Sequence, residues 1–252
     1  MNALDEKDVI PNYPRAGESI IALVIAIAVN IFLAIVLIIF VFVYSESIPS
    51  LEDIADIGRL EEFMRPIFEE TFSPAFIVVS GVFSFGVWPF LFLRTRRGQI
   101  KSILRLNFTP DSLLIGILSG VAMVFVALGL EWVVSQVVTQ DMMIELQNSA
   151  MIANYGGWRF GLGVLAMGVV TGFCEEVFFR GFMMRGFENS FKSPWLAIFL
   201  TSFIFAILHL NISIFVLAMV MGFLVIKTNS LYTSITCHAT YNSIVLAITV
   251  FG

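Results

Sequence analysis

The stretch Gly172–Arg185, which reads GFCEEVFFRGFMMR, decides how the rest of the chain is interpreted. It is strongly apolar, yet it holds two adjacent carboxylates, Glu175 and Glu176, and Arg180 follows the second at four residues. Ionisable groups are costly inside a membrane and are kept where they face a partner or a wet cavity. The stretch therefore predicts a functional site within a membrane-spanning helix.

Helical spacing separates the two acids of this stretch. Glu176 and Arg180 stand at positions i and i+4 with the acid first, which is the favourable order for an ion pair within a helix. Glu175 lies about 100° further round the helix and is left without a partner. We therefore expect Glu176 and Arg180 to form a structural ion pair and Glu175 to be free for chemistry. A purely stabilising charge cluster is the weaker alternative, because buried ion pairs stabilise poorly.

The composition places the whole chain in a membrane. Of its 252 residues 58% are apolar and 13% are charged, whereas soluble domains have about 45–50% and 25%. The chain is predicted to be an all-α, polytopic bundle of transmembrane helices, with residues 1–252 forming a single membrane domain. The net charge of −5 shows no excess of basic residues of the kind that binds nucleic acid.

Apolar runs predict about seven membrane spans. They cover approximately Ile20–Tyr44, Pro74–Leu93, Ser112–Val138, Trp158–Phe187, Pro194–Asn211, Ile212–Lys227 and Leu231–Phe251.

An acidic segment follows the first span. Its apolar residues recur at steps of three and four, which predicts an amphipathic helix lying on the membrane interface near residues 51–68. The run Arg94–Arg105 holds five basic residues and no acid, so it should lie in the cytoplasm. We expect the protein in the plasma membrane of a prokaryote, with a cytoplasmic N-terminus.

The only two histidines of the chain lie in late apolar spans. His209 closes the sequence FAILH, and His238 opens HATYN, which places Asn242 one turn later on the same helical face. Transmembrane spans seldom carry such groups unless they converge. We therefore predict that Glu175, His209, His238 and Asn242 meet in one site.

Two kinds of chemistry fit these four residues. A carboxylate and an imidazole can hold a water and take its proton as it attacks, while a second imidazole and an amide donate to the developing oxyanion. This would hydrolyse an amide bond without a serine or cysteine nucleophile. Alternatively, Glu175, His209 and His238 could hold zinc as three ligands, with water as the fourth. The residues alone leave both mechanisms open.

The three motifs also resemble those of a known family. EEVFFR, FAILH and HATYN are similar, in order, to the EExxxR, FxxxH and HxxxN motifs of the CPBP family of intramembrane proteases. That family includes the CAAX prenyl endopeptidases and bacteriocin-processing and self-immunity proteins. The resemblance covers the motif-bearing core, about Gly157–Gly252, and implies an all-helical endopeptidase. Its substrate would be a hydrophobic or lipid-modified peptide or protein, prenylated or membrane-embedded, cut near its C-terminus or leader.

The resemblance also implies a role for each residue. Glu175 and His209 would activate the water, His238 and Asn242 would stabilise the oxyanion, and the Glu176–Arg180 pair would hold the architecture. Family members are described both as metalloproteases and as metal-independent glutamate proteases. If His238 serves the oxyanion, only two zinc ligands remain, so we favour a mechanism without zinc or another cofactor.

Two other functions compete with proteolysis. An ion-coupled transporter could relay charge through the same groups, but the chain shows neither inverted repeats nor paired Gly- or Pro-broken spans. A non-catalytic membrane scaffold or bacteriocin-immunity protein could sense a peptide without cutting it, but it would not need an unpaired carboxylate. Proteolysis within the lipid bilayer is therefore the favoured interpretation.

Overall fold

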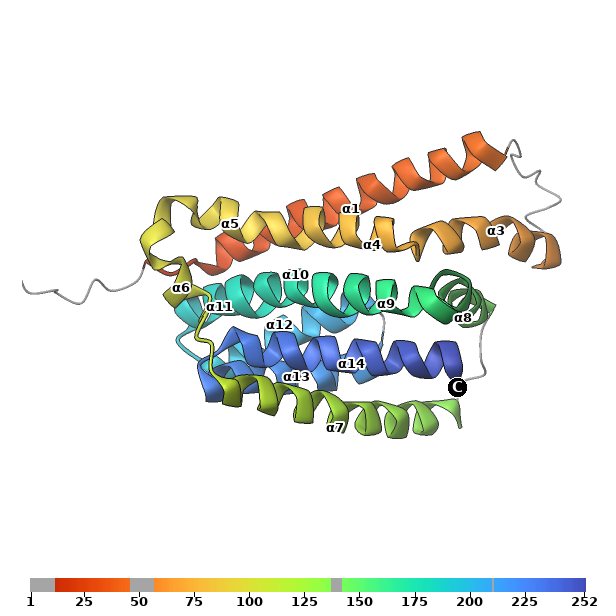
Figure 1. Ribbon diagram of the computed structural model, residues 1–252. Helices are drawn as coiled ribbons and strands as arrows, with labels where there is room; N and C mark the ends of the chain where they lie inside the picture. The colour runs from red at the N-terminus through yellow and green to blue at the C-terminus, as the bar shows by residue number, and fades with distance from the viewer. Residues whose placement is uncertain (1–11, 46–56, 137–141, 210) are drawn as a thin grey trace, which may run out of the picture.

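The computed structural model describes residues 12–45, 57–136, 142–209 and 211–252. In these ranges the chain is a bundle of helices without a β-strand (Figure 1), which confirms the predicted all-α class. In this part of the chain, five helical segments are long and apolar enough to cross a membrane. They are Ala16–Val41, Pro74–Arg96, Pro110–Val133, Gly157–Phe191 and Leu231–Phe251.

The prediction of seven spans is approximate. The two other apolar segments form the helices α12 (Pro194–His209) and α13 (Ile212–Thr228), which have 16 and 17 residues. At 1.5 Å per residue they are about 24–26 Å long, shorter than a hydrocarbon core of about 30 Å. They pack against each other as a hairpin, so His209, the last residue of α12, lies near its tip.

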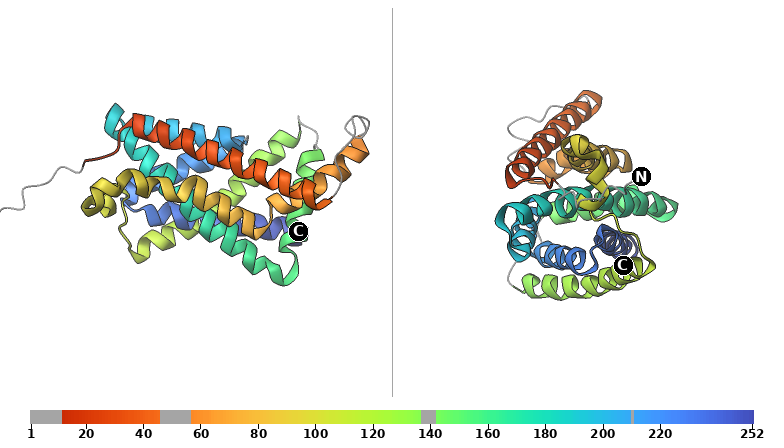
Figure 2. Two further views of the ribbon diagram at one scale, coloured as in Figure 1. Left: turned by 90° about the horizontal axis from the view of Figure 1, so that it is seen from above. Right: turned by 90° about the vertical axis from the view of Figure 1, so that its left-hand side faces the viewer.

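The long helical segment Gly157–Phe191 runs through the middle of the bundle (Figures 1 and 2). On one side of it lie the N-terminal helices, and on the other lie α7, α12, α13 and α14. The segment consists of η3 (Gly157–Arg159), α9 (Phe160–Gly163), η4 (Val164–Thr171), α10 (Gly172–Glu176), η5 (Val177–Met183) and α11 (Met184–Phe191).

The N-terminal helices form an antiparallel layer on this segment (Figure 1). They are α1 (Ala16–Ser45), α3 (Ile57–Thr71), α4 (Pro74–Gly81), η1 (Val82–Gly86), α5 (Val87–Leu93), η2 (Arg94–Gln99) and α6 (Ile100–Ile103). The amphipathic helix predicted near residues 51–68 corresponds to α3, although residues 51–56 lie outside the described residues. The connection that follows α7 (Pro110–Ser135) contains a further helix, α8 (Met142–Tyr155), which packs against α3.

Two glycines bring α7 into backbone contact with α14 (Leu231–Phe251). A Cβ atom at Gly116 would lie 2.6 Å from the carbonyl oxygen of Thr233, and one at Gly120 would lie 2.6 Å from that of Cys237. Both distances are far below van der Waals contact, so only glycine fits. Small residues four apart commonly allow close helix packing in membranes. The close contact with α7 fixes the position of α14 and therefore of His238.

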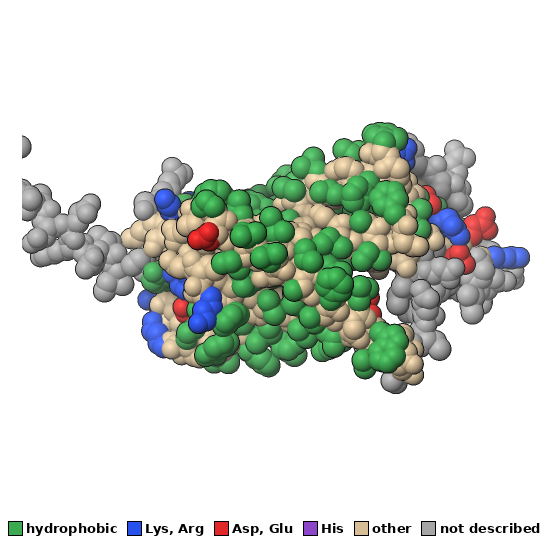
Figure 3. All heavy atoms as spheres, turned by 60° about the horizontal axis from the view of Figure 1, so that its bottom comes forward, with side chains coloured by type: hydrophobic (Ala, Val, Ile, Leu, Met, Phe, Trp, Pro, Cys, Tyr) green, Lys and Arg blue, Asp and Glu red, His purple; other side chains and the backbone are tan. Residues whose placement is uncertain are grey.

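The surface carries a broad apolar band with charged ends (Figure 3). Exposed apolar side chains are dense on α1, where Phe32 is 63% and Val43 is 68% exposed. Basic side chains gather where α5, α6 and α11 end, and they include Arg94, Arg96, Lys101, Arg105, Arg185 and Lys192. An apolar belt between polar ends is what a bilayer requires, so the chain is an integral membrane protein.

Candidate active site

The paired glutamates lie between two π-helical segments. Glu175 and Glu176 belong to α10, with η4 before them and η5 after them. In η4 the Thr171 hydroxyl donates to the carbonyl of Ala166, five residues back, at 2.9 Å. Wide turns of this kind occur inside α-helices mostly as short bulges and often at functional sites. Regular α-helical spacing, which the sequence suggested here, therefore holds only over the short turn that carries the acids.

Glu176 and Arg180 form the ion pair that their spacing suggests. Arg180 Nη1 lies 2.8 Å from Glu176 Oε1, and both side chains are buried. The guanidinium also donates from Nη2 to the carbonyl of Ala218 in α13, at 3.4 Å, and lies 4.6 Å from the ring centre of Phe205 in α12. Arg180 thus links the central helix to the α12–α13 hairpin.

His238 lies between the two glutamates. Its Nδ1 is 2.9 Å from Glu176 Oε1, and its Nε2 is 3.7 Å from Glu175 Oε2. The expectation that Glu175 has no partner is therefore wrong, because α14 packs on α10 closely enough to place the imidazole between both acids. A hydrogen bond from Nδ1–H to the Glu176 carboxylate fixes the ring and turns Nε2 towards Glu175.

Glu175 is only 7% exposed, and the separation of 3.7 Å from His238 is longer than a direct hydrogen bond. Polar groups that are not in direct hydrogen-bond contact can share a water that contacts both. A water in this position would contact a carboxylate that can accept its proton and an imidazole that can orient it. The geometry can therefore support attack by an activated water.

His209 lies beside this cluster and not within it. The side chain is exposed, and its Nδ1 is 2.8 Å from the carbonyl oxygen of Phe205. A bond from Nδ1–H to this carbonyl would leave Nε2 as an acceptor. Among the contacts of the described residues, His209 forms no hydrogen bond or ion pair with Glu175, Glu176 or His238.

Phe205 is the residue whose importance the sequence did not reveal. Its ring centre is 4.3 Å from that of His209 and 6.1 Å from that of His238, and its ring also faces Arg180. The side chain therefore packs among three of the predicted site residues. The available signal was its place one turn before His209 in the FAILH motif.

Asn242 contacts the central helix. Its Nδ2 donates to the carbonyl oxygen of Met167 in η4, at 3.1 Å. This bond uses one of the two amide hydrogens and ties α14 to the π-helical turn that precedes the glutamates. The second hydrogen remains for a ligand. The structure therefore gives Asn242 an anchoring contact in addition to the oxyanion role expected for it.

The three potential zinc ligands are not gathered as a metal site. In the part of the chain that the structure describes, no three His, Cys, Asp or Glu side chains lie close enough together to hold a metal ion. Glu175 and His238 approach each other, but His209 does not join them. The arrangement does not fit a three-ligand zinc site, and the chemistry below uses the side chains alone.

Comparison with known proteins matches one part of the chain to a family. Residues 157–244, about a third of the chain, match the family model described as "Type II CAAX prenyl endopeptidase Rce1-like". Searches of curated proteins and of solved structures gave no match. The matched segment contains the central helix with both glutamates, His209, His238 and Asn242. Over this segment the chain is similar to CAAX-type endopeptidases, and the match supports its assignment to the CPBP/CAAX protease family.

Proposed function

We propose that this protein hydrolyses a peptide bond near the C-terminus or the leader of a hydrophobic or lipid-modified protein. The observation that carries the proposal is the buried Glu175 carboxylate, which faces His238 Nε2 at 3.7 Å. A carboxylate held in a dry site beside an imidazole is suited to general base catalysis. The match to CAAX-type endopeptidases supports the same reaction.

In the proposed reaction Glu175 accepts a proton from the attacking water, and the water oxygen bonds to the carbonyl carbon of the substrate. His209, whose Nε2 is free to accept, helps to orient this water once substrate is bound. The protonated Glu175 then gives its proton to the leaving amine as the carbon–nitrogen bond breaks. The products are a carboxylate and an amine, and no covalent enzyme intermediate forms.

The developing oxyanion needs donors, and His238 and Asn242 provide them in this proposal. Asn242 keeps one amide hydrogen after bonding to Met167. His238 uses Nδ1–H on Glu176, so it must carry a second proton on Nε2 to donate to the oxyanion. Glu176 acts here as a positioning residue, because it orients His238 without touching the substrate.

The surface supports a substrate that arrives from the membrane. Exposed apolar side chains, dense on the face in Figure 3, are found on the helices around the site, and the exposed His209 lies at the end of a helix too short to span. A prenylated or membrane-embedded protein could reach the site without leaving the bilayer. The basic end of the bundle supports an orientation with the N-terminus in the cytoplasm. The plasma membrane of a prokaryote is the location proposed for it.

A cleavage screen in matched membranes tests the proposal. Peptides with prenylated C-termini, bacteriocin-type leaders and transmembrane peptides are incubated with membranes holding equal amounts of the native protein, Glu175→Ala or Glu131→Ala. Glu131 is an exposed acid on α7 and serves as the control. Mass spectrometry should show hydrolysis products with the native protein and Glu131→Ala only. Products that appear equally with Glu175→Ala, or no cleavage of any class, would contradict the proposal.

A further inference from the structure

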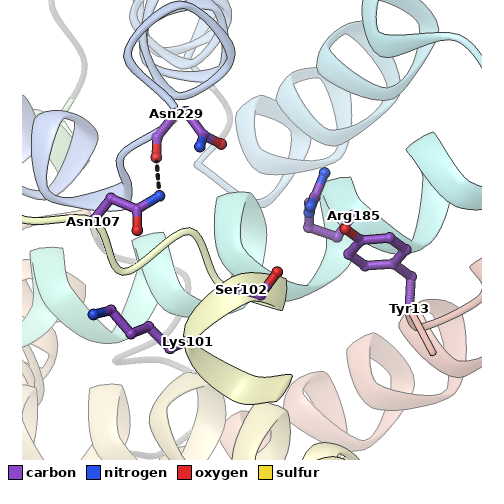
Figure 4. Close-up of a pocket in the computed structure, with 6 residues that line it drawn as sticks. All are labelled: Tyr13, Lys101, Ser102, Asn107, Arg185 and Asn229. Atoms are coloured by element: carbon purple, nitrogen blue, oxygen red, sulfur yellow. Dashed lines mark hydrogen bonds between the residues drawn. The ribbon is translucent and has the colours of Figure 1, made fainter. Parts of the chain in front are cut away.

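A polar pocket lies at the basic end of the bundle, on elements other than those that carry the catalytic residues. Its volume is about 370 Å³. Six residues from four separate segments of the chain line it, and Figure 4 shows them as Tyr13, Lys101, Ser102, Asn107, Arg185 and Asn229. All six side chains can donate a hydrogen bond, so the pocket is built for a ligand rich in acceptors.

The walls of the pocket are held in place by contacts among these segments. The Asn107 amide donates to the carbonyl oxygen of Asn229 at 2.9 Å, which joins the loop before α7 to the turn before α14. Arg185 Nε donates to the carbonyl oxygen of Ile103 at 3.1 Å, and its guanidinium lies 4.5 Å from the ring centre of Tyr13. The Asn107 and Arg185 side chains are therefore positioned before any ligand arrives.

Positive charge is in excess at this corner. Glu188 pairs with both Arg185, at 2.6 Å, and Arg105, at 3.2 Å. Within the described residues the Lys101 side chain has no hydrogen bond or ion pair, and Nε and Nη1 of the buried Arg105 have no hydrogen-bond partner. Glu188 thus faces two arginines. Burial and the neighbouring Arg185 lower the pKa of Arg105, against the opposing effect of Glu188.

We propose that this pocket binds a phosphate group. A phosphate offers several acceptor oxygens in a tetrahedral arrangement and pairs with arginine and lysine more strongly than neutral groups do. Basic pockets between helices at the cytoplasmic face of membrane proteins bind lipid headgroups, and this pocket lies where the apolar band ends. The phosphate can come from an anionic lipid headgroup or from solution, and the experiment separates these sources.

The test measures thermal unfolding of the full chain in detergent during titration with dihexanoyl-phosphatidylglycerol, inorganic phosphate or dihexanoylglycerol, which lacks phosphate. Lys101→Gln removes an exposed cation of the pocket, whereas Lys227→Gln removes an exposed cation outside its lining. We expect phosphatidylglycerol to stabilise the native protein and Lys227→Gln alike. Lys101→Gln should bind it about fivefold more weakly, as expected for one lysine near an anionic lipid.

The outcomes distinguish the source of the phosphate. Stabilisation that depends on Lys101 and occurs only with phosphatidylglycerol identifies a lipid headgroup. The same dependence with inorganic phosphate identifies phosphate from solution. Equal affinities of native protein and Lys101→Gln, equal stabilisation by dihexanoylglycerol, or stabilisation by neither phosphate ligand would overturn the proposal. The readout is binding, so it does not depend on proteolysis.

Discussion

His238 Nδ1 lies 2.9 Å from Oε1 of Glu176, the second of the two adjacent glutamates. The same oxygen accepts from Arg180 at 2.8 Å. A carboxylate that neutralises an arginine and also holds an imidazole has little capacity left to activate water. Within the described residues the first glutamate, Glu175, forms no ion pair with an arginine or lysine, and it faces the other nitrogen of His238. The geometry thus separates two adjacent, chemically identical side chains into a positioning residue and a candidate base.

The close packing of α7 on α14 gives a prediction about stability. Gly120→Ala would place a Cβ atom 2.6 Å from the Cys237 carbonyl oxygen, so the helices must separate, at a cost of about 1–3 kcal/mol in the free energy of unfolding. Gly129→Ala on the same helix meets nothing within 4 Å and should be neutral or stabilising by about 0.5–1 kcal/mol. Thermal unfolding in detergent measures both, and equal stability of the two variants would show that the helices are not in contact.

His209 should matter for cleavage and hardly for folding. Its side chain is exposed, and the hydrogen bond that it forms among the described residues is to the backbone of its own helix, so His209→Ala should unfold close to the native temperature. Loss of a group that orients the attacking water should slow cleavage about 10²-fold or more. Leu208→Ala, an exposed neighbour, is the control and should keep its activity. If His209→Ala cleaves at the native rate, His209 has no part in activating water.

The orientation in the membrane can be tested by labelling from one side. Both native cysteines, Cys174 and Cys237, are buried, so background labelling in intact cells should be low. A cysteine at the exposed Ser102, near the basic run, should react with an impermeant maleimide only after the membrane is opened. A cysteine at the exposed Glu70, at the other end of the bundle, should react in intact cells. The reverse pattern would invert the proposed topology.

Much of the fold could be predicted because apolar length and charge are local properties of the sequence. The runs that predicted spans correspond to helices in the structure, and the i, i+4 spacing of Glu176 and Arg180 led directly to their ion pair. What the hydropathy pattern could not show is depth: α12 and α13 are apolar enough to be counted as spans and yet too short to cross as straight helices.

The details of the site depend on contacts between distant segments. His238 lies between both glutamates because of how α14 packs on α10. The spacing of residues within either helix does not predict this packing. The sequence does show that Gly116 and Gly120 of α7 stand four residues apart. It does not show which helix they contact. The π-helical turns leave no mark in the residue pattern, so the helix around Glu175 was expected to be regular.

The arrangement of the histidines leads to a prediction about metal. Because His209 does not join Glu175 and His238, we expect purified protein to hold well under one zinc per chain. Cleavage should continue after exhaustive chelation, since side chains alone would activate the water. Metal content and activity are measured on the same sample. Stoichiometric zinc, lost with activity in both His209→Ala and His238→Ala and restored by adding metal to stripped protein, would establish a metal site instead.

The central claim is that the two adjacent glutamates differ in function, and the comparison of Glu175→Gln with Glu176→Gln tests it most directly. Glutamine keeps the size of the side chain but cannot take a proton. Glu175→Gln should therefore change stability by about 1 kcal/mol or less while slowing cleavage about 10²–10⁴-fold. Glu176→Gln leaves Arg180 buried without its counter-charge and should cost about 3–5 kcal/mol.

The measurement is the thermal unfolding midpoint and the cleavage rate of both variants in the same detergent, beside the native protein. We predict a folded, inactive Glu175→Gln and a strongly destabilised Glu176→Gln. Equal destabilisation of the two variants, or a Glu175→Gln that cleaves at the native rate, would contradict it.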